Sequence, residues 1–152
     1  MLALLVSGNM LYGQENEKEA LAKLSFMMGN WEGTSTVYGD TTKRVSVSEK
    51  VHYMLDGNLL VLEVNSSLIQ LHTVISYSLK DGAYYYHPFS KRGGGTYKGE
   101  VKDQKFIVTF GEERRLVFER TDKGAFHEYG EKLVDNQWEK YFEDLLYPTS
   151  EK

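Results

Sequence analysis

The chain has 152 residues, of which 41% are hydrophobic and 26% are charged, values typical of a single globular domain. Its net charge of −4 argues against a nucleic-acid-binding surface, which would need a basic face, and the lack of cysteine excludes disulfides, thiolate metal ligands and a cysteine nucleophile. The 11 tyrosines, 7 phenylalanines and 2 tryptophans favour β-strands, because aromatic side chains suit half-buried pleated surfaces.

Residues 1–14 resemble the remnant of a secretory signal peptide. Leu2 to Val6 form a short apolar run, and Gly13-Gln14 lies near a possible cleavage point. We therefore expect an exported protein, periplasmic or secreted; the alternative is an apolar terminus that packs on the domain. The apolar run is too short to span a bilayer, so no integral membrane segment is expected. The rest of the chain should form one domain over residues 15–148, followed by a polar tail over 149–152.

Residues 15–28 have the spacing of a short amphipathic helix. Its apolar residues fall close to one face: Ala20, Leu21, Leu24, Met27 and Met28. We expect this helix to form a lid over one end of the fold. Gly29 can adopt the left-handed conformation that ends helices, and Trp31 should anchor the core. Gly33 should either let the new strand bend or let another backbone come close.

From Asn30 onward the chain reads as about ten strands separated by turn signals. The predicted strands are 31–38, 44–54, 59–65, 71–79, 83–87, 96–101, 105–110, 114–120, 125–134 and 137–147. Pro88 to Gly95 is predicted to be a mobile loop, and Pro148 is expected to stop the pairing. Strands at even spacing without intervening helices form a sandwich or an up-and-down barrel.

Closure into a barrel is the better interpretation, because an open meander of this length would leave two long sheet edges exposed. We therefore predict an all-β fold, an up-and-down antiparallel β-barrel of about eight to ten strands with a short N-terminal helix, wide enough for one small ligand. Several faces that alternate toward the interior carry polar residues, namely Glu49, Thr73 and Tyr77. A packed core would exclude these groups unless each were paired, so the pattern favours a lumen.

Gly29-Asn30-Trp31, which follows the predicted helix and opens the first strand, resembles the Gly-x-Trp motif of the lipocalins and their calycin relatives. Other stretches resemble a group of small bacterial lipocalin-like domains of unassigned function: Ile75-Ser76-Tyr77, Lys80-Asp81-Gly82, Gly95-Thr96-Tyr97-Lys98-Gly99-Glu100, Phe118-Glu119, Phe126-His127-Glu128 and Trp138-Glu139-Lys140. The resemblance implies a β-barrel that binds a small, mainly apolar molecule. It places Trp31 at the closed end, with an arginine from a late strand across it: Arg114, Arg115 or Arg120.

We predict that the lumen binds a small hydrophobic or amphipathic ligand. Trp31 would close the base, aromatic residues would form the wall and polar residues would orient one end of the ligand; the wall residues are Tyr77, Tyr86 and Trp138, and the polar pair is Arg115 and Glu128. No catalytic residue, cofactor or metal site is assigned. The four histidines have no metal-binding spacing, and we expect the carboxylates of Glu49, Glu119 and Glu128 to face solvent.

Two alternatives remain open. The first is an enzyme on the same barrel that uses His72 or His127 with Glu128 as acid–base groups, which requires a histidine and a carboxylate within hydrogen-bond reach inside a pocket. The second is a barrel filled with side chains that binds a partner protein through exposed tyrosines, which requires a contiguous aromatic patch on the outside.

Overall fold

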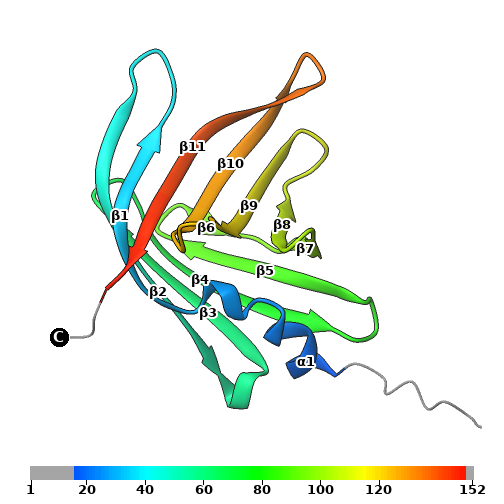
Figure 1. Cartoon of the computed structure of the whole chain (residues 1–152). Helices are drawn as coiled ribbons and strands as arrows, with labels where there is room; N and C mark the ends of the chain where they lie inside the picture. Colours follow the sequence, from blue (N-terminus) through cyan, green and yellow to red (C-terminus); the bar gives the residue numbers. More distant parts are fainter. Residues whose placement is uncertain (1–15, 150–152) are drawn as a thin grey trace, which may run out of the picture.

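A computed structural model describes residues 16–149, so the predicted signal remnant at residues 1–14 lies outside the described residues. Over the described range the chain forms a closed antiparallel up-and-down β-barrel of ten strands, with one short α-helix near its start (Figure 1). The predicted fold class is confirmed, since an all-β barrel with a short helix is what the structure shows.

The strands follow the predicted turns closely. They are β1 (Gly29–Val37), β2 (Lys43–Met54), β3 (Leu59–Ser66), β4 (Gln70–Ser78), β5 (Ala83–Ser90), β6 (Gly93–Gly94), β7 (Tyr97–Lys102), β8 (Lys105–Thr109), β9 (Arg114–Arg120), β10 (Phe126–Val134) and β11 (Gln137–Pro148). Around the barrel the order is β4-β3-β2-β1-β11-β10-β9-β8-β7-β5, and pairing of β4 with β5 closes the circle.

One predicted loop is largely strand. Residues 88–95 were expected to be irregular, but β5 continues through Pro88 to Ser90, and the two-residue β6 then pairs back onto it. Pro88 lacks an N–H donor, yet it lies opposite Thr73 of β4, so a proline here does not end the pairing. The hairpin of β5 and β6 therefore belongs to the rim of the barrel.

The N-terminal helix is shorter than predicted. Helix α1 spans only Glu17–Ala22 and is followed by a separate 3₁₀ turn, η1 (Ser25–Met27). Asn16 caps α1: its side chain accepts a hydrogen bond from the Glu19 N–H, and the Glu19 carboxylate accepts one from the Asn16 N–H. The break after α1 keeps Leu24 and Met27 fully buried.

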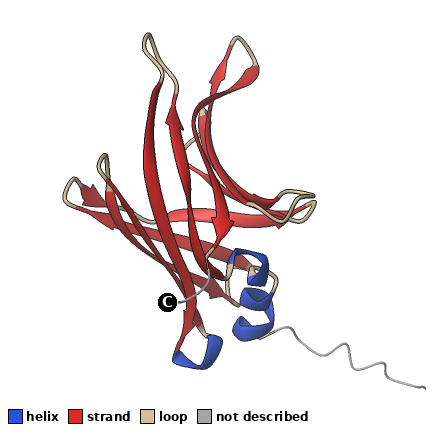
Figure 2. Cartoon of the chain, turned by 60° about the vertical axis from the view of Figure 1, so that its left-hand side comes forward, coloured by secondary structure: helices blue, strands red, loops and turns tan. Residues whose placement is uncertain are grey.

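Three aromatic side chains tie this helical segment to one end of the barrel. The hydroxyls of Tyr84 and Tyr53 donate hydrogen bonds to the carbonyls of Ala20 and Leu21 at 2.7 and 3.0 Å, and the Trp31 indole N–H donates to Met27 at 2.9 Å. Each of these two carbonyls also accepts a hydrogen bond from the backbone N–H three residues later, so the hydroxyls add a second hydrogen bond at the end of the helix. Figure 2 shows α1 and the turn between β2 and β3 at this closed end, with long hairpins at the other end.

The closed half of the barrel is filled by stacked aromatic rings. Phe106, Phe118 and Phe126 on adjacent strands have ring centroids 5.7 and 6.2 Å apart, and Trp31 lies 5.4 Å from Phe126. The guanidinium carbon of Arg120, on β9, lies 4.5 Å from the centre of the Trp31 ring. Of the three candidate arginines, Arg120 therefore takes the position across the tryptophan.

Gly33 brings β1 and β11 unusually close, which is one of the two roles expected for it. A Cβ atom built on Gly33 would lie 2.1 Å from the carbonyl oxygen of Leu145, which no L-residue can accommodate without moving backbone. Gly33→Ala is expected to lower the free energy of unfolding in urea by at least about 2 kcal/mol. Gly39→Ala is the control, since nothing lies within 4 Å of its Cβ position. Equal stability of the two variants would contradict the close approach.

Candidate functional site

The open half of the barrel contains a cavity of about 460 Å³. Its wall is mostly apolar and is drawn from β1, β2, β3, β4 and β11: Val37, Val47, Val64, Leu71 and Phe142. The strand register gives the depth of the cavity residues. Val37 pairs with Phe142 toward the mouth, and Ser35 pairs with Asp144 one inward position deeper, on the side of Trp31. This volume is within the range of pockets that hold a small molecule.

The deep end of the cavity is acidic. Glu128 and Asp144 line it from paired positions on β10 and β11, and Glu49 of β2 lies close to both. The two-residue period of the strands places them inside: Glu128 follows Phe126 on the same face, Asp144 precedes Leu146, and Glu49 lies between Val47 and Val51. The three side chains are only 2%, 6% and 6% exposed for Glu49, Glu128 and Asp144.

These three carboxyls, which we call the acidic cluster, form no ion pair with a basic side chain within residues 16–149. One oxygen of each lies within 4.8 Å of the others. Both carboxyl oxygens of Glu49 and the Oδ1 atom of Asp144 are buried and have no hydrogen-bond partner among the described residues. A buried polar group without a partner costs about 1–3 kcal/mol, so the acidic cluster is an unusual feature for a purely structural interior.

Burial makes these groups hold protons more strongly than exposed carboxyls do. It raises the pKa of Glu49 to about 8 and that of Asp144 to about 6, and it raises the pKa of Glu128 well above its ordinary value. At Glu49 the neighbouring Glu128 carboxyl lowers the pKa and the charge of Asp144 raises it. At Glu128 the charges of Glu49 and Asp144 raise the pKa further, whereas the Ser35 hydroxyl lowers the pKa of Asp144. The acidic cluster therefore carries less negative charge at neutral pH than three free carboxylates would.

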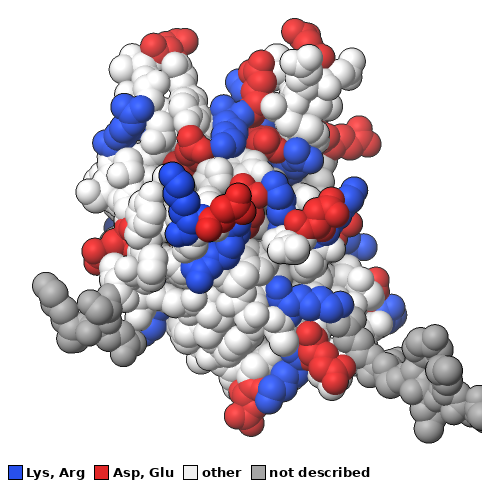
Figure 3. All heavy atoms as spheres, in the orientation of Figure 1, with Lys and Arg blue, Asp and Glu red and all other residues white. Residues whose placement is uncertain are grey.

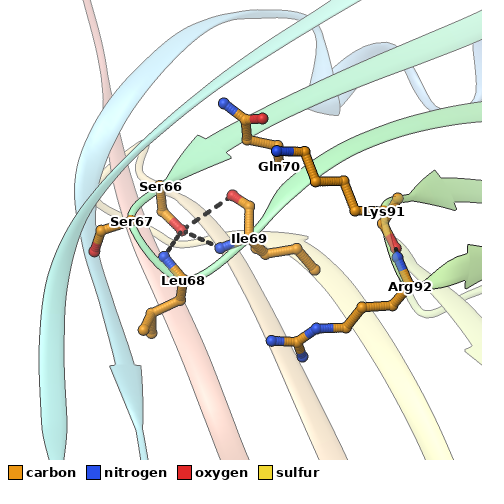
Figure 4. A pocket seen from close by; sticks show the side chains of 8 residues that line it. Ser66, Ser67, Leu68, Ile69, Gln70, Lys91 and Arg92 are labelled. Atoms are coloured by element: carbon orange, nitrogen blue, oxygen red, sulfur yellow. Dashed lines mark hydrogen bonds between the residues drawn. The ribbon is translucent and has the colours of Figure 1, made fainter.

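At the mouth the cavity is lined by Leu68 and Ile69 from the turn between β3 and β4 and by Arg92 from the turn between β5 and β6; Figure 4 shows these two turns. The Ser66 hydroxyl shapes the first turn: it accepts hydrogen bonds from the N–H groups of Leu68 and Ile69 at 3.2 and 3.1 Å. Arg92 extends from the second turn toward Leu68. Lys43 and Arg92 both line the cavity, so its mouth is basic while its deep end is acidic.

The predicted site residues divide between the interior and the outside. Glu128 lines the cavity, and Trp31 lies at the closed end. Tyr86 is buried next to the acidic cluster; burial, then the charge of Glu128, raises the pKa of its hydroxyl. Tyr77 lies nearer α1, with its ring 4.8 Å from that of Tyr84. Of these four residues only Glu128 contacts the cavity itself.

Arg115 and Trp138 lie together on the outer face of the barrel, away from the cavity. The Arg115 guanidinium carbon is 4.2 Å from the centre of the Trp138 ring, and the Arg115 Nε atom donates to Glu131 at 2.6 Å. Arg115 alternates with Leu116, which is buried inside, so the two-residue period directs Arg115 outward. These two residues form a surface contact with each other.

The histidines of the enzyme hypothesis also face outward. His127 lies between two carboxylates, with its Nδ1 3.0 Å from Glu119 and its Nε2 2.9 Å from Glu143, on the side opposite Glu128. His72 is 53% exposed and lies 3.7 Å from Glu63. Neither meets a carboxylate inside the cavity. Figure 3 shows acidic and basic side chains interleaved on the face that carries β11.

The expectation that the carboxylates of Glu49 and Glu128 face solvent is wrong. The structure also bears on the aromatic patch that the partner-protein alternative requires. The carboxylates of Glu49 and Glu128 do not face solvent but are buried in the lumen, whereas that of Glu119 lies on the outer face, 2.6 Å from Lys105. Asp144 was missed, although it alternates with Phe142 and Leu146 and so could have been placed inside from the sequence. Among the described residues the exposed aromatics are Tyr38 after β1, Phe89 on β5, and Trp138 and Tyr147 near opposite ends of β11.

Comparison with models of protein families gave no match, and a search of curated proteins gave no significant match. Within residues 16–149 no helix is both long and apolar enough to cross a bilayer. Architecture and site therefore define the class: an antiparallel β-barrel closed at one end by a helix and an aromatic core, with a cavity at its open end.

Proposed function

We propose that the protein binds a small amphipathic molecule in the cavity at the open end of the barrel. The observation that carries this proposal is the cavity itself, about 460 Å³ with a mostly apolar wall and polar groups confined to its two ends. Burial of an apolar ligand body against Val37, Val64 and Leu71 supplies the free energy of binding, and the polar ends fix the orientation. The filled-barrel alternative is less well supported, because only the closed half of the lumen is packed with side chains.

The relation to the calycins belongs to this proposal. It is supported by the Gly-x-Trp motif at the start of β1, by the helical segment over the closed end and by Arg120 across Trp31. Export belongs to it as well and is supported by the apolar run in residues 1–14. A calycin-type binding protein released from the cell would meet its ligand outside the cytoplasm.

The proposal is tested by filling the cavity. The neutral probe N-phenyl-1-naphthylamine, whose emission rises in apolar surroundings, is titrated into the full chain. Val37→Trp places a large ring at the mouth and is expected to weaken binding at least about tenfold. Leu145→Trp is the matched control, because Leu145 is 38% exposed and does not line the cavity. Equal probe affinity in both variants and the parent would refute binding in the cavity.

A further inference from the structure

The two ends of the cavity carry opposite charge. Glu128 and Asp144 line the deep end with Glu49 next to them, whereas Lys43 and Arg92 line the mouth. No basic side chain among residues 16–149 forms an ion pair with any of the three acids. The charge separation along the cavity therefore distinguishes one end of a ligand from the other.

Among the described residues, the Ser35 hydroxyl lies beside Asp144 at the deep end, but it does not satisfy every carboxyl oxygen there. Oδ1 of Asp144 is buried and unpartnered in a side chain that is 6% exposed and lines the cavity, and both oxygens of Glu49 are also unpartnered. Asp144, with a pKa of about 6, is mainly ionised at neutral pH, and an ionised carboxylate only accepts hydrogen bonds. A ligand group that satisfies its Oδ1 atom must therefore donate, and it gains most if it is positive. A buried anion without a cation is costly, and a bound cation removes that cost.

The cavity wall decides which kind of cation fits. Between the acidic end and the mouth the lining is mainly Val37, Val47, Val64, Leu71 and Phe142. An apolar wall of this kind gives little to a hydrated metal ion but favours a hydrocarbon body. An ammonium group has three donors and no acceptor, which matches a set of converging carboxyl oxygens.

We propose, resting on the proposed binding function, that the ligand is an amphipathic organic amine whose ammonium group binds to Asp144 and Glu128 while its apolar body lies along the valines of the wall. Glu49 supports the ammonium site as the third carboxyl of the acidic cluster. An anionic group elsewhere on the ligand would lie at the mouth, near Lys43 and Arg92. A simple fatty acid fits poorly, because its tail would then cover the buried carboxyls without donating to them.

Three probes with the same hydrocarbon chain and different head groups test this inference. Octylamine, 1-octanol and octanoate are titrated separately into the full chain by isothermal titration calorimetry at neutral pH. Octylamine is expected to bind at least about tenfold more tightly than 1-octanol, and octanoate more weakly than both. In Asp144→Asn the octylamine affinity should fall about tenfold while the 1-octanol affinity is unchanged. Glu139→Gln, an exposed acid on the same strand, should change neither.

Other results of these titrations would contradict the amine inference, the proposed binding function, or both. Equal affinity for the three probes, or a preference for octanoate, would overturn the amine inference and leave the proposed binding function intact. Failure of all three to bind, together with failure of the naphthylamine probe, would overturn both. Manganese(II) chloride is titrated alone as well: tight binding of Mn²⁺ that Asp144→Asn removes, with no preference for octylamine, would show a metal site instead. Circular dichroism of each variant confirms that it is folded.

Discussion

The free energy of unfolding in urea is expected to be higher at about pH 5 than at about pH 8.5, by a few kcal/mol. The physical reason is Glu49, whose pKa burial raises from 4.5 to about 8 in the folded barrel. A group with a raised folded-state pKa contributes stability that is fully present below the unfolded pKa and is lost as pH rises through the folded pKa. Each pKa unit corresponds to about 1.4 kcal/mol, and Asp144, with a pKa of about 6, adds a smaller loss at lower pH.

At low pH the free energy of unfolding is expected to fall as pH falls, which is the opposite of its change at alkaline pH. Although burial raises it, hydrogen bonds from Lys140, Tyr38 and His127 lower the pKa of Glu143 to about 2. Stability from that outer-face carboxylate is present above its unfolded pKa and is lost as pH falls through the folded value. Loss on both sides therefore places the maximum stability near about pH 5.

Glu49→Gln should flatten the alkaline side of this profile, because the amide cannot ionise. The control is Glu100→Gln, which removes an exposed carboxylate from β7 and should leave the profile unchanged. A parent profile that is flat or rises between about pH 5 and 8.5 would show that Glu49 is not buried as an acid.

Trp31→Ala is expected to lower the free energy of unfolding by about 3–5 kcal/mol, enough to unfold many domains of this size. Trp31 is 2% exposed, stacks near Phe126, lies under Arg120 and donates a hydrogen bond to Met27. Its removal would leave a cavity at the closed end and free the 3₁₀ turn that the indole N–H holds. Urea unfolding followed by circular dichroism measures the change.

The second tryptophan provides a matched control. Trp138 is 36% exposed on the outer face, so Trp138→Ala should cost less than about 1 kcal/mol. Trp31→Phe keeps a ring but loses the N–H donor and should fall between the two alanine variants. If both alanine variants unfold at the same urea concentration, Trp31 does not anchor the closed end.

Turn chemistry explains why the strands could be predicted so fully from the sequence. Asp135 and Asn136 both have positive φ, 48° and 62°, which is the conformation of the two-residue turn that matches strand twist. Asp56 and Gly57 likewise have φ values of 55° and 90°. The residue types of these turns therefore fix where strands end. The short β6 was missed because Gly93 and Gly94 carry no strand signal and pair only through their backbone.

The site was predicted less well, since its residues come together only after register is known. Glu128 was named as a ligand-binding residue and Glu49 as a polar residue on an inward face, but Asp144 was not named, and no local pattern links the three on β10, β2 and β11. A break in register between Gly130 and Glu131 also shifts the alternation along β10, so faces assigned from one end do not hold at the other. Alternation therefore distinguished the two faces within a single strand, but it did not show which inward residues of different strands meet in the lumen.

Pairing of β1 with β11 makes completion of the barrel depend on the strand of the barrel that comes last in the chain. Until Gln137–Pro148 leaves the ribosome, β1 and β10 each present an open edge that can pair with another nascent chain. Closure then joins Trp31 to Pro148, residues far apart in the sequence, and contacts of such long range form slowly. The yield of folded protein in a cell should therefore decrease as the rate of expression increases, because unpaired β1 and β10 edges of neighbouring nascent chains then meet more often.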